Sequence, residues 1–139
     1  YIVSDIRCGF CRAMEKNLEQ MTDITIYRIP VAFLGAESMR LANAAWCAQD
    51  RLTAWKDISD KKAIVNKEVA CNTPIKDNND LMDNWKVKAT PTLFRADGQR
   101  WAQGLLSVEF TKMFLEKGTY ETTQAVQAAQ AAQNAKEKK

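Results

Sequence analysis

The sequence predicts an α/β domain in which a mixed β-sheet is flanked by helices. Residues 1–3 are apolar and lead into a helical pattern over 10–21, and the alternating run 24–29 is rich in β-branched residues. Later in the chain, Asp97-Gly98 stands between two short apolar runs and indicates a hairpin turn. The order strand, helix, strand, helical segment, hairpin and helix is typical of an α/β fold with a mixed sheet.

The first predicted strand, helix and second strand follow one another closely. We expect a strand over residues 1–3, a turn over 4–7 and a helix over 10–21. One face of this helix is apolar and should be buried: Ala13, Met14, Leu18 and Met21. The second strand is expected over 24–29, and Pro30 should end its regular pairing because proline has no N–H to donate to a sheet.

A helical insert, from about residue 36 to about residue 85, is predicted between the second strand and the hairpin. Ser38 can cap a helix that runs to about residue 49. A second helical piece follows over 51–57, a polar loop over 59–66 and another helix over 77–85. The buried side of the first helix is expected to hold Met39, Leu41, Ala42, Ala45 and Trp46. The other two helices carry apolar residues at Leu52, Trp55, Leu81, Met82 and Trp85.

The last part of the chain predicts a hairpin, a helix and a tail. The hairpin strands are expected over 92–95 and 100–102, and Ser107 and Gly118 can begin and close the following helix. Residues 119–139 are rich in glutamine and alanine, with little apolar bulk to hold them down, so we expect a frayed helix or disorder. The sequence therefore predicts one domain over residues 1–118 and a separate tail.

Composition excludes several classes of function. The chain has 139 residues, of which 46% are hydrophobic, which is enough for one domain with a core. The formal charge of +3 is small, and no basic run is interleaved with aromatic residues, so nucleic-acid binding has little support. The sequence contains no histidine, which excludes Ser-His-Asp and Cys-His catalysis.

Cys8-Gly9-Phe10-Cys11 carries the chemistry that we predict for this chain. The motif places Cys8 at the first turn of a helix, where unpaired backbone N–H groups and the helix dipole favour an anion. For a cysteine that anion is the nucleophilic thiolate, so we expect a lowered pKa for the Cys8 thiol. Cys11 lies one turn further in and can close a disulfide with Cys8. The pattern indicates an attacking thiol, Cys8, and a resolving thiol, Cys11.

A CxxC pair can also be half of a zinc site or a purely structural disulfide. Structural zinc sites need a second pair of ligands, but Cys47 and Cys71 are isolated from each other and the chain has no histidine. We therefore predict no metal site and no cofactor. A structural ring between Cys8 and Cys11 is the weaker alternative, because so small a ring constrains little of the unfolded chain.

Cys47 and Cys71 can be buried free thiols, a second redox pair or a structural disulfide. We favour the structural disulfide, because a dithiol that turns over in an oxidising compartment implies surroundings in which other cysteines pair. The bridge would close a loop of about 25 residues and stabilise the fold by about 3.5 kcal/mol.

Four residues around the cysteines are predicted to contact a substrate. A proline at the start of an apolar strand marks an edge, a turn or a cis bond, and beside a CxxC helix we favour a cis Thr90–Pro91 bond that faces the dithiol. The Thr90 backbone would then offer an edge to an extended peptide. Gly9 and Phe10 would add contacts to unfolded chains, with a hydrophobic helix cap as the alternative for Phe10. For Asp5 we favour a role in a turn or as a cap over a role as a proton relay.

Together these motifs resemble the thioredoxin fold and, more closely, the catalytic domain of the DsbC/DsbG-type disulfide isomerases. The resemblance rests on three segments: Asp5-Ile6-Arg7-Cys8-Gly9-Phe10-Cys11, Ala45-Trp46-Cys47-Ala48-Gln49-Asp50 and Ala89-Thr90-Pro91-Thr92. Cys71 falls where that family places the partner of its Trp-Cys cysteine. The resemblance covers roughly residues 1–117, and Phe10 and Ala89 depart from the tyrosine and glycine that are usual in the family.

The resemblance implies a thioredoxin-like mixed sheet with a helical insert between the CxxC helix and the cis-proline strand. It also implies a periplasmic thiol:disulfide interchange protein that isomerises or reduces disulfides in misoxidised or unfolded proteins and is kept reduced by a DsbD-like membrane partner. A DsbA-like dithiol oxidase and a redox-inactive chaperone module of the same fold are the alternatives. Because Tyr1 lies inside a predicted strand, we expect that the signal peptide and the dimerisation domain through which this family forms homodimers lie outside this chain.

Overall fold

A four-stranded mixed sheet forms the centre of the computed structural model, which describes residues 1–66, 68, 69, 71–98, 101–116 and 120–137, without the side chains of 120–127 and 137. The strand order is β2-β1-β3-β4, with the bounds β1 Ile2–Asp5, β2 Arg28–Val31, β3 Thr92–Phe94 and β4 Trp101–Gln103. Strand β1 is parallel to β2 and antiparallel to β3, and β3 is antiparallel to β4. The mixed sheet predicted from the sequence is thus confirmed.

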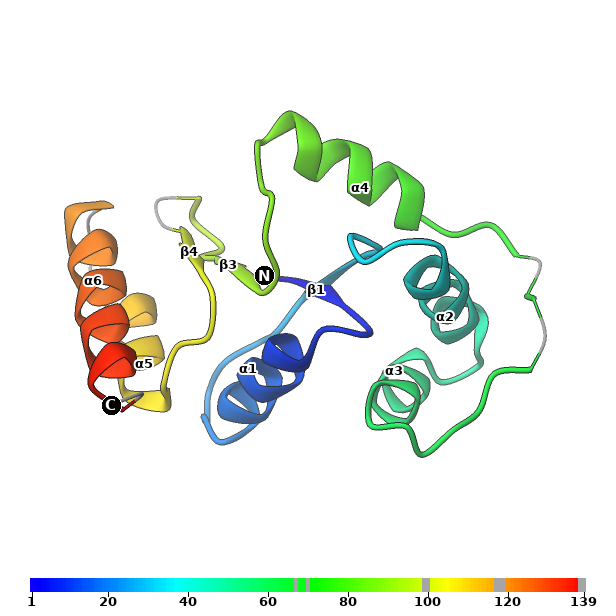
Figure 1. The fold of residues 1–139 in the computed structure, drawn as a ribbon, viewed down its shortest axis with the longest axis horizontal. Helices are drawn as coiled ribbons and strands as arrows, with labels where there is room; N and C mark the ends of the chain where they lie inside the picture. Colours follow the sequence, from blue (N-terminus) through cyan, green and yellow to red (C-terminus); the bar gives the residue numbers. More distant parts are fainter. Residues whose placement is uncertain (67, 70, 99–100, 117–119, 138–139) are drawn as a thin grey trace.

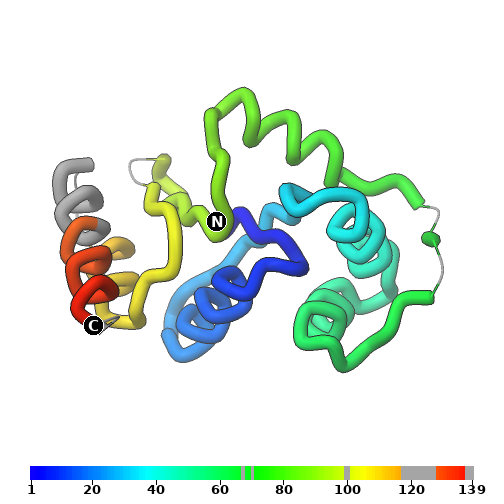
Figure 2. The backbone as a smooth tube through the Cα atoms, viewed as in Figure 1, coloured from blue at the N-terminus to red at the C-terminus, as the bar shows by residue number. Residues whose placement is uncertain are grey.

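Helices surround this sheet on all sides in the view of Figure 1. Their bounds are α1 Gly9–Glu19, α2 Ala36–Cys47, α3 Arg51–Ser59, α4 Ile75–Asn84, α5 Val108–Glu116 and α6 Tyr120–Glu137. Helices α2, α3 and α4 form the predicted insert between β2 and β3. In Figure 2 the chain passes from the β2 side of the molecule, where α2 and α3 lie, to the β4 side, where α5 and α6 lie.

The two faces of the sheet are covered by different helices. Ile2 and Val3 are both buried and point to opposite faces, as neighbours in a strand do. The face of Ile2 packs against a cluster that includes Met14 of α1 and Phe114 of α5. The face of Val3 packs against Met82 of α4. The helix that carries the two cysteines of the CxxC motif is therefore held on one face by its apolar side.

The second strand differs from the prediction. Strand β2 begins at Arg28, not at Ile24, because β1 begins at Ile2 and the parallel register places Ile2 opposite Arg28. Pro30 lies within β2 rather than after it, which is tolerated because β2 is at the edge of the sheet and needs donors on one side only. Strand β1 also continues through Asp5, where we expected a turn.

Helix α4 covers the outer edge of β2. The side-chain amide of Asn78 donates to the carbonyl oxygen of Pro30 at 2.9 Å. The backbone N–H of Ala32, just after the strand, donates to Oδ1 of Asn79 at 2.8 Å. Backbone groups on the outward side of this strand are therefore engaged by two neighbouring side chains of one helix.

Three apolar residues of the helical insert are exposed. Leu52 borders an open cavity of about 180 Å³ between α2, α3 and β2. Leu81 lies next to the buried Met82 on α4, so the helical turn directs it away from the sheet. Trp85 follows the end of α4 and packs edge-on against Phe94, with 5.9 Å between ring centroids.

The start of α2 also differs from the prediction. The helix begins at Ala36, after Gly35, whose φ of +101° lies in the region that favours glycine. Ser38 is therefore inside the first turn and buried, rather than at the N-cap position.

The glutamine- and alanine-rich tail forms helix α6, and its described part packs against α5 and β4. Gln130 is 8% exposed, and its Oε1 accepts the N–H of Ser107 at 2.9 Å. The hydroxyl of Ser107 in turn accepts the N–H of Phe110, so its predicted capping role is confirmed. The tail, which the sequence predicts to be frayed or disordered for lack of apolar side chains, is thus held by a polar contact. The expected helix end at Gly118 lies outside the described residues. Within the part of the chain described, none of the helices combines the length and the hydropathy needed to cross a lipid bilayer.

Candidate active site

Cys8 occupies the N-cap position of α1, one residue before the helical turn in which we expected it. Its Sγ accepts a hydrogen bond from the backbone N–H of Cys11 at 3.2 Å. Its own N–H donates to the carbonyl oxygen of Asp5 at 3.0 Å. An N-cap side chain satisfies one of the unpaired N–H groups of a helix, and a sulfur that accepts this bond is stabilised as the thiolate.

The surroundings of Cys8 lower its pKa to about 6. The largest cause is a hydrogen bond from the side chain of Cys11. The side chain of Thr90 and the backbone N–H groups of Cys11 and Phe10 also lower the pKa, and burial of the sulfur opposes them. Cys8 is therefore largely ionised at neutral pH, as the helix-start argument predicted.

The pKa of Cys11 moves in the opposite direction. Its thiol shares a hydrogen bond with Cys8 and lies in the core, with a side chain that is 1% exposed, and both effects raise its pKa. When one of two adjacent thiols is ionised, its charge disfavours ionisation of the other. The reduced site therefore holds one negative charge, on Cys8, and one proton, on Cys11.

Thr90 and Pro91, far along the chain, meet this site. The Cys8 sulfur lies 3.6 Å from the carbonyl oxygen of Thr90, and the Thr90–Pro91 peptide bond is cis. The carbonyl of Pro91 is already used, because it accepts the N–H of Gly104 at 2.8 Å. Thr90 is half-buried and Pro91 is buried, so the accessible part of this bend is Thr90.

Gly9 and Phe10 lie on the open side of the site. The Phe10 side chain is 68% exposed, which is unusual for an aromatic group. A Cβ added at Gly9 would lie 3.8 Å from the Arg12 guanidinium, an ordinary van der Waals distance. The surface beside Cys8 thus presents an exposed aromatic ring at Phe10 and no side chain at Gly9.

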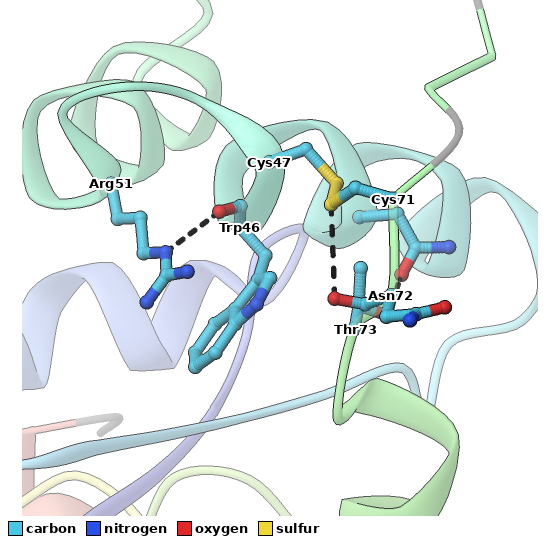
Figure 3. The surroundings of a disulfide bond; sticks show 7 residues. Trp46, Cys47, Arg51, Cys71, Asn72 and Thr73 are labelled. Carbon is cyan, nitrogen blue, oxygen red and sulfur yellow. Dashed lines mark hydrogen bonds between the residues drawn. A yellow bond between two sulfur atoms is a disulfide. The ribbon is translucent and has the colours of Figure 1, made fainter.

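Cys47 and Cys71 form a disulfide, with 6.0 Å between their Cα atoms (Figure 3). Cys47 is the last residue of α2, and Cys71 precedes α4. Near the bridge, Arg51 donates to the carbonyl of Trp46 and lies over its ring, 4.0 Å from the centroid. The bridge therefore joins two parts of the helical insert and leaves Cys8 and Cys11 as free thiols.

Sequence reasoning missed the contacts that hold α1 and its preceding turn. Arg12, one residue after Cys11, donates from Nη1 to the carbonyl of Ser59 at the end of α3, at 2.5 Å. Ser38 donates to the carboxylate of Asp5, 33 positions earlier in the chain. No local pattern signals such pairs, because the partners are distant in sequence. Among the residues that the structure describes, no group of three or more potential ligands could hold a metal ion.

The ionisation of Cys8 gives a first prediction. In the reduced protein, absorbance of the thiolate near 240 nm should titrate with a midpoint of about 6, and iodoacetamide should label Cys8 but not Cys11 near pH 7. Folding lowers the pKa of Cys8 from its ordinary value of 9.0 to about 6. Ionisation of Cys8 therefore stabilises the fold fully above pH 9, and this contribution falls with the pH and is lost below about 6. A Cys8→Ser variant should show neither the titration nor this change in stability. Equal labelling of both thiols would contradict the assignment.

Comparisons with known proteins identify relatives of this chain. The family model of the thioredoxin-like domain matches residues 1–118. A probable thiol:disulfide interchange protein DsbC from Bordetella avium is 33% identical over 108 residues, which cover 76% of this chain and 37% of that protein. DsbC from Escherichia coli K12 is 27% identical over 104 residues, covering 70% of this chain and 42% of that protein. The chain thus spans less than half the length of these relatives.

A solved structure shows the same fold. The crystal structure of a disulfide interchange protein from Neisseria gonorrhoeae superposes with a TM-score of 0.71 at 27% identity, covering 91% of this chain and 85% of that one. This likeness confirms the fold predicted from the CxxC helix, the insert and the Thr-Pro strand. With a family match that extends over residues 1–118, the chain belongs to the family of thioredoxin-like domains.

Proposed function

We propose that this chain catalyses thiol–disulfide exchange and acts as a disulfide isomerase or reductase on misoxidised proteins. The observation that carries the proposal is the state of Cys8: a sulfur at the start of α1, with a pKa of about 6, beside an accessible peptide edge at Thr90. The names of its relatives, thiol:disulfide interchange proteins, support the same chemistry.

The proposed reaction begins at Cys8. Its thiolate attacks one sulfur of a substrate disulfide, so that a bond forms between Cys8 and that sulfur while the other substrate sulfur leaves as a thiolate. If a substrate thiolate then attacks the mixed disulfide, Cys8 is released and the substrate is isomerised without net electron transfer. If Cys11 attacks instead, Cys8 and Cys11 form a disulfide, and the substrate gains two electrons.

The two thiols suit these roles for different reasons. A low pKa makes Cys8 both ionised at neutral pH and a good leaving group in the second step. Cys11 keeps its proton while Cys8 is ionised, because the adjacent negative charge disfavours a second one. Once Cys8 is bonded to a substrate, that charge is gone and Cys11 ionises more easily, so it can attack the mixed disulfide.

Substrate contact is proposed for Gly9, Phe10, Thr90 and Pro91. The exposed ring of Phe10 can cover apolar side chains of a partly unfolded protein, and the backbone of Thr90 can pair with an extended segment. Phe10→Ser should therefore slow exchange with an unfolded protein while leaving exchange with glutathione disulfide nearly unchanged. A matched loss with both substrates would argue against a contact surface at Phe10.

The compartment and partners are part of the same proposal. The Cys47–Cys71 disulfide suits an oxidising compartment, for which we propose the bacterial periplasm. A reduced Cys8–Cys11 pair would there need a reductant, for which we propose a membrane protein related to DsbD. Homodimer formation is also proposed, through a region equivalent to the part of the relatives that lies beyond this match.

The experiment that tests this function separates isomerisation from oxidation. A protein with scrambled disulfides is incubated with the reduced chain, and recovery of its native activity is compared with the rate of simple reduction. We expect recovery that depends on Cys8. Faster disulfide formation in a reduced substrate would identify a DsbA-like oxidase. Full protection of an aggregating client by Cys8→Ser, without recovery of scrambled protein by the parent chain, would identify a binding module.

A further inference from the structure

We infer that Asp5 is a positioning residue for the dithiol, because its buried carboxylate fastens the turn that carries Cys8 to the start of α2. The inference rests on the proposed exchange function for its importance. Its evidence and its test concern only the geometry around Cys8.

The Asp5 carboxylate is fully engaged by donors from two parts of the chain. The residue is 1% exposed. Its Oδ1 accepts the backbone N–H of Arg7 at 2.9 Å and the hydroxyl of Ser38 at 2.7 Å, and its Oδ2 accepts the N–H of Leu34 at 2.9 Å. A buried carboxylate is costly unless such bonds replace water, so the three donors fix its position closely.

On the α2 side, Asp5 binds one group just before the helix and one in its first turn. The residue before α2 is Gly35, which has no side chain to accept a hydrogen bond. The carboxylate of Asp5 instead meets the N–H of Leu34, which precedes the helix, and the hydroxyl of Ser38 in its first turn. A negative charge near the start of a helix is favourable. The start of the insert is therefore tied to strand β1.

On the dithiol side, Asp5 holds the turn through both its side chain and its backbone. Its side chain binds the N–H of Arg7, and its carbonyl oxygen accepts the N–H of Cys8. The Asp5 backbone also acts on the Cys11 thiol, whose pKa it lowers. A shift of this turn would move the Cys8 sulfur away from the N–H of Cys11, 3.2 Å away, which helps to stabilise the thiolate.

The positioning role and a simple charge effect predict opposite results. Removing a negative charge near Cys8 would by itself favour its thiolate and lower the pKa. Loosening the turn would weaken the hydrogen bonds to the thiolate and raise the pKa. The direction of the change therefore distinguishes the two effects.

The test is a thiolate titration of reduced Asp5→Ala, Asp5→Asn and Ser38→Ala proteins by absorbance near 240 nm. For Asp5→Ala we expect the midpoint to rise by about one pH unit, so that the rate of Cys8 alkylation at pH 6 falls about fivefold. Asparagine keeps an oxygen that can accept from Arg7 and Ser38, but it presents an NH2 group to the N–H of Leu34, where an acceptor is needed. Asp5→Asn should therefore show a smaller rise in the midpoint. Ser38→Ala keeps the Arg7 bond, so its thermal midpoint should fall while its titration stays near that of the parent.

Three outcomes would overturn the inference. The first is an unchanged or lower midpoint in folded Asp5→Ala, as judged by circular dichroism. If that variant does not fold, an unchanged midpoint in Asp5→Asn has the same force. The third is a rise in Ser38→Ala as large as that in Asp5→Ala. Because no turnover is measured, failure of the scrambled-disulfide assay would refute the proposed function without touching this result.

Discussion

Replacement of Cys8 by serine is expected to reduce disulfide exchange to the uncatalysed rate, whereas replacement of Cys11 by serine should trap the protein in covalent complexes with its substrates. A serine hydroxyl does not ionise near neutral pH and forms no bond to a substrate sulfur, so the first variant has no attacking group. The second keeps the ionised Cys8 but has no resolving thiol.

Non-reducing electrophoresis with an unfolded disulfide substrate distinguishes the two variants. Cys11→Ser should give bands of higher mass that disappear with reductant, and Cys8→Ser should give none. Stable complexes formed by Cys8→Ser, through Cys11, would reverse the assigned roles.

Cys11→Ala provides a matched control for the electrostatics. The hydrogen bond from the Cys11 side chain is the largest cause of the low pKa of Cys8. Serine can still donate this bond, but alanine cannot. We therefore expect the thiolate midpoint to stay near 6 in Cys11→Ser and to rise in Cys11→Ala.

Removal of the Cys47–Cys71 bridge should have the largest effect on stability. The bridge spans 24 positions of the sequence, and the loss of loop-closure entropy corresponds to about 3.5 kcal/mol in the free energy of unfolding. That is a large share of the stability of an ordinary domain. Denaturant unfolding of the Cys47→Ser, Cys71→Ser double variant measures the difference, on a background in which Cys8 and Cys11 are both serine, so that no free thiol can exchange with the bridge of the reference protein.

Two further measurements identify the source of that loss. The Thr73 hydroxyl donates to Asn43 between the same two segments, so Thr73→Val tests a nearby contact without opening the bridge, and we expect a loss of only about 1 kcal/mol. The Cys8 titration should be unchanged in the double variant that retains Cys8 and Cys11. A loss below about 1 kcal/mol for the double variant would mean that the insert is held by other contacts.

The features that the sequence predicts correctly are local ones. The CxxC helix, the Asp97-Gly98 hairpin and the cap at Ser107 each depend on residues a few positions apart, so a single segment contains the whole signal. The low pKa of Cys8 belongs to the same class, because its largest cause is the side chain of Cys11, three positions away, and the backbone at the helix start adds to it.

The features that it does not predict depend on distant partners. The strand-like run before Arg28 remains outside β2 because the register of β1, not local propensity, determines where pairing begins. Helix α2 begins at Ala36 without a side-chain cap, beside contacts of Asp5 with Leu34 and Ser38 that no local pattern signals. The tail is held by Gln130, whose contact with Ser107 spans 23 positions.

The covering of β2 by α4 has a consequence for the function proposed above, in which the domain would meet partly unfolded proteins. Such proteins expose unpaired strands, which readily add to any open sheet edge and can seed aggregates. Here Asn78 and Asn79 hydrogen-bond to backbone groups along the outer edge of β2, and Pro30 has no N–H to donate there. Under the proposed function, a partly unfolded protein would therefore find no open strand edge at β2 and could dissociate once the exchange reaction is complete.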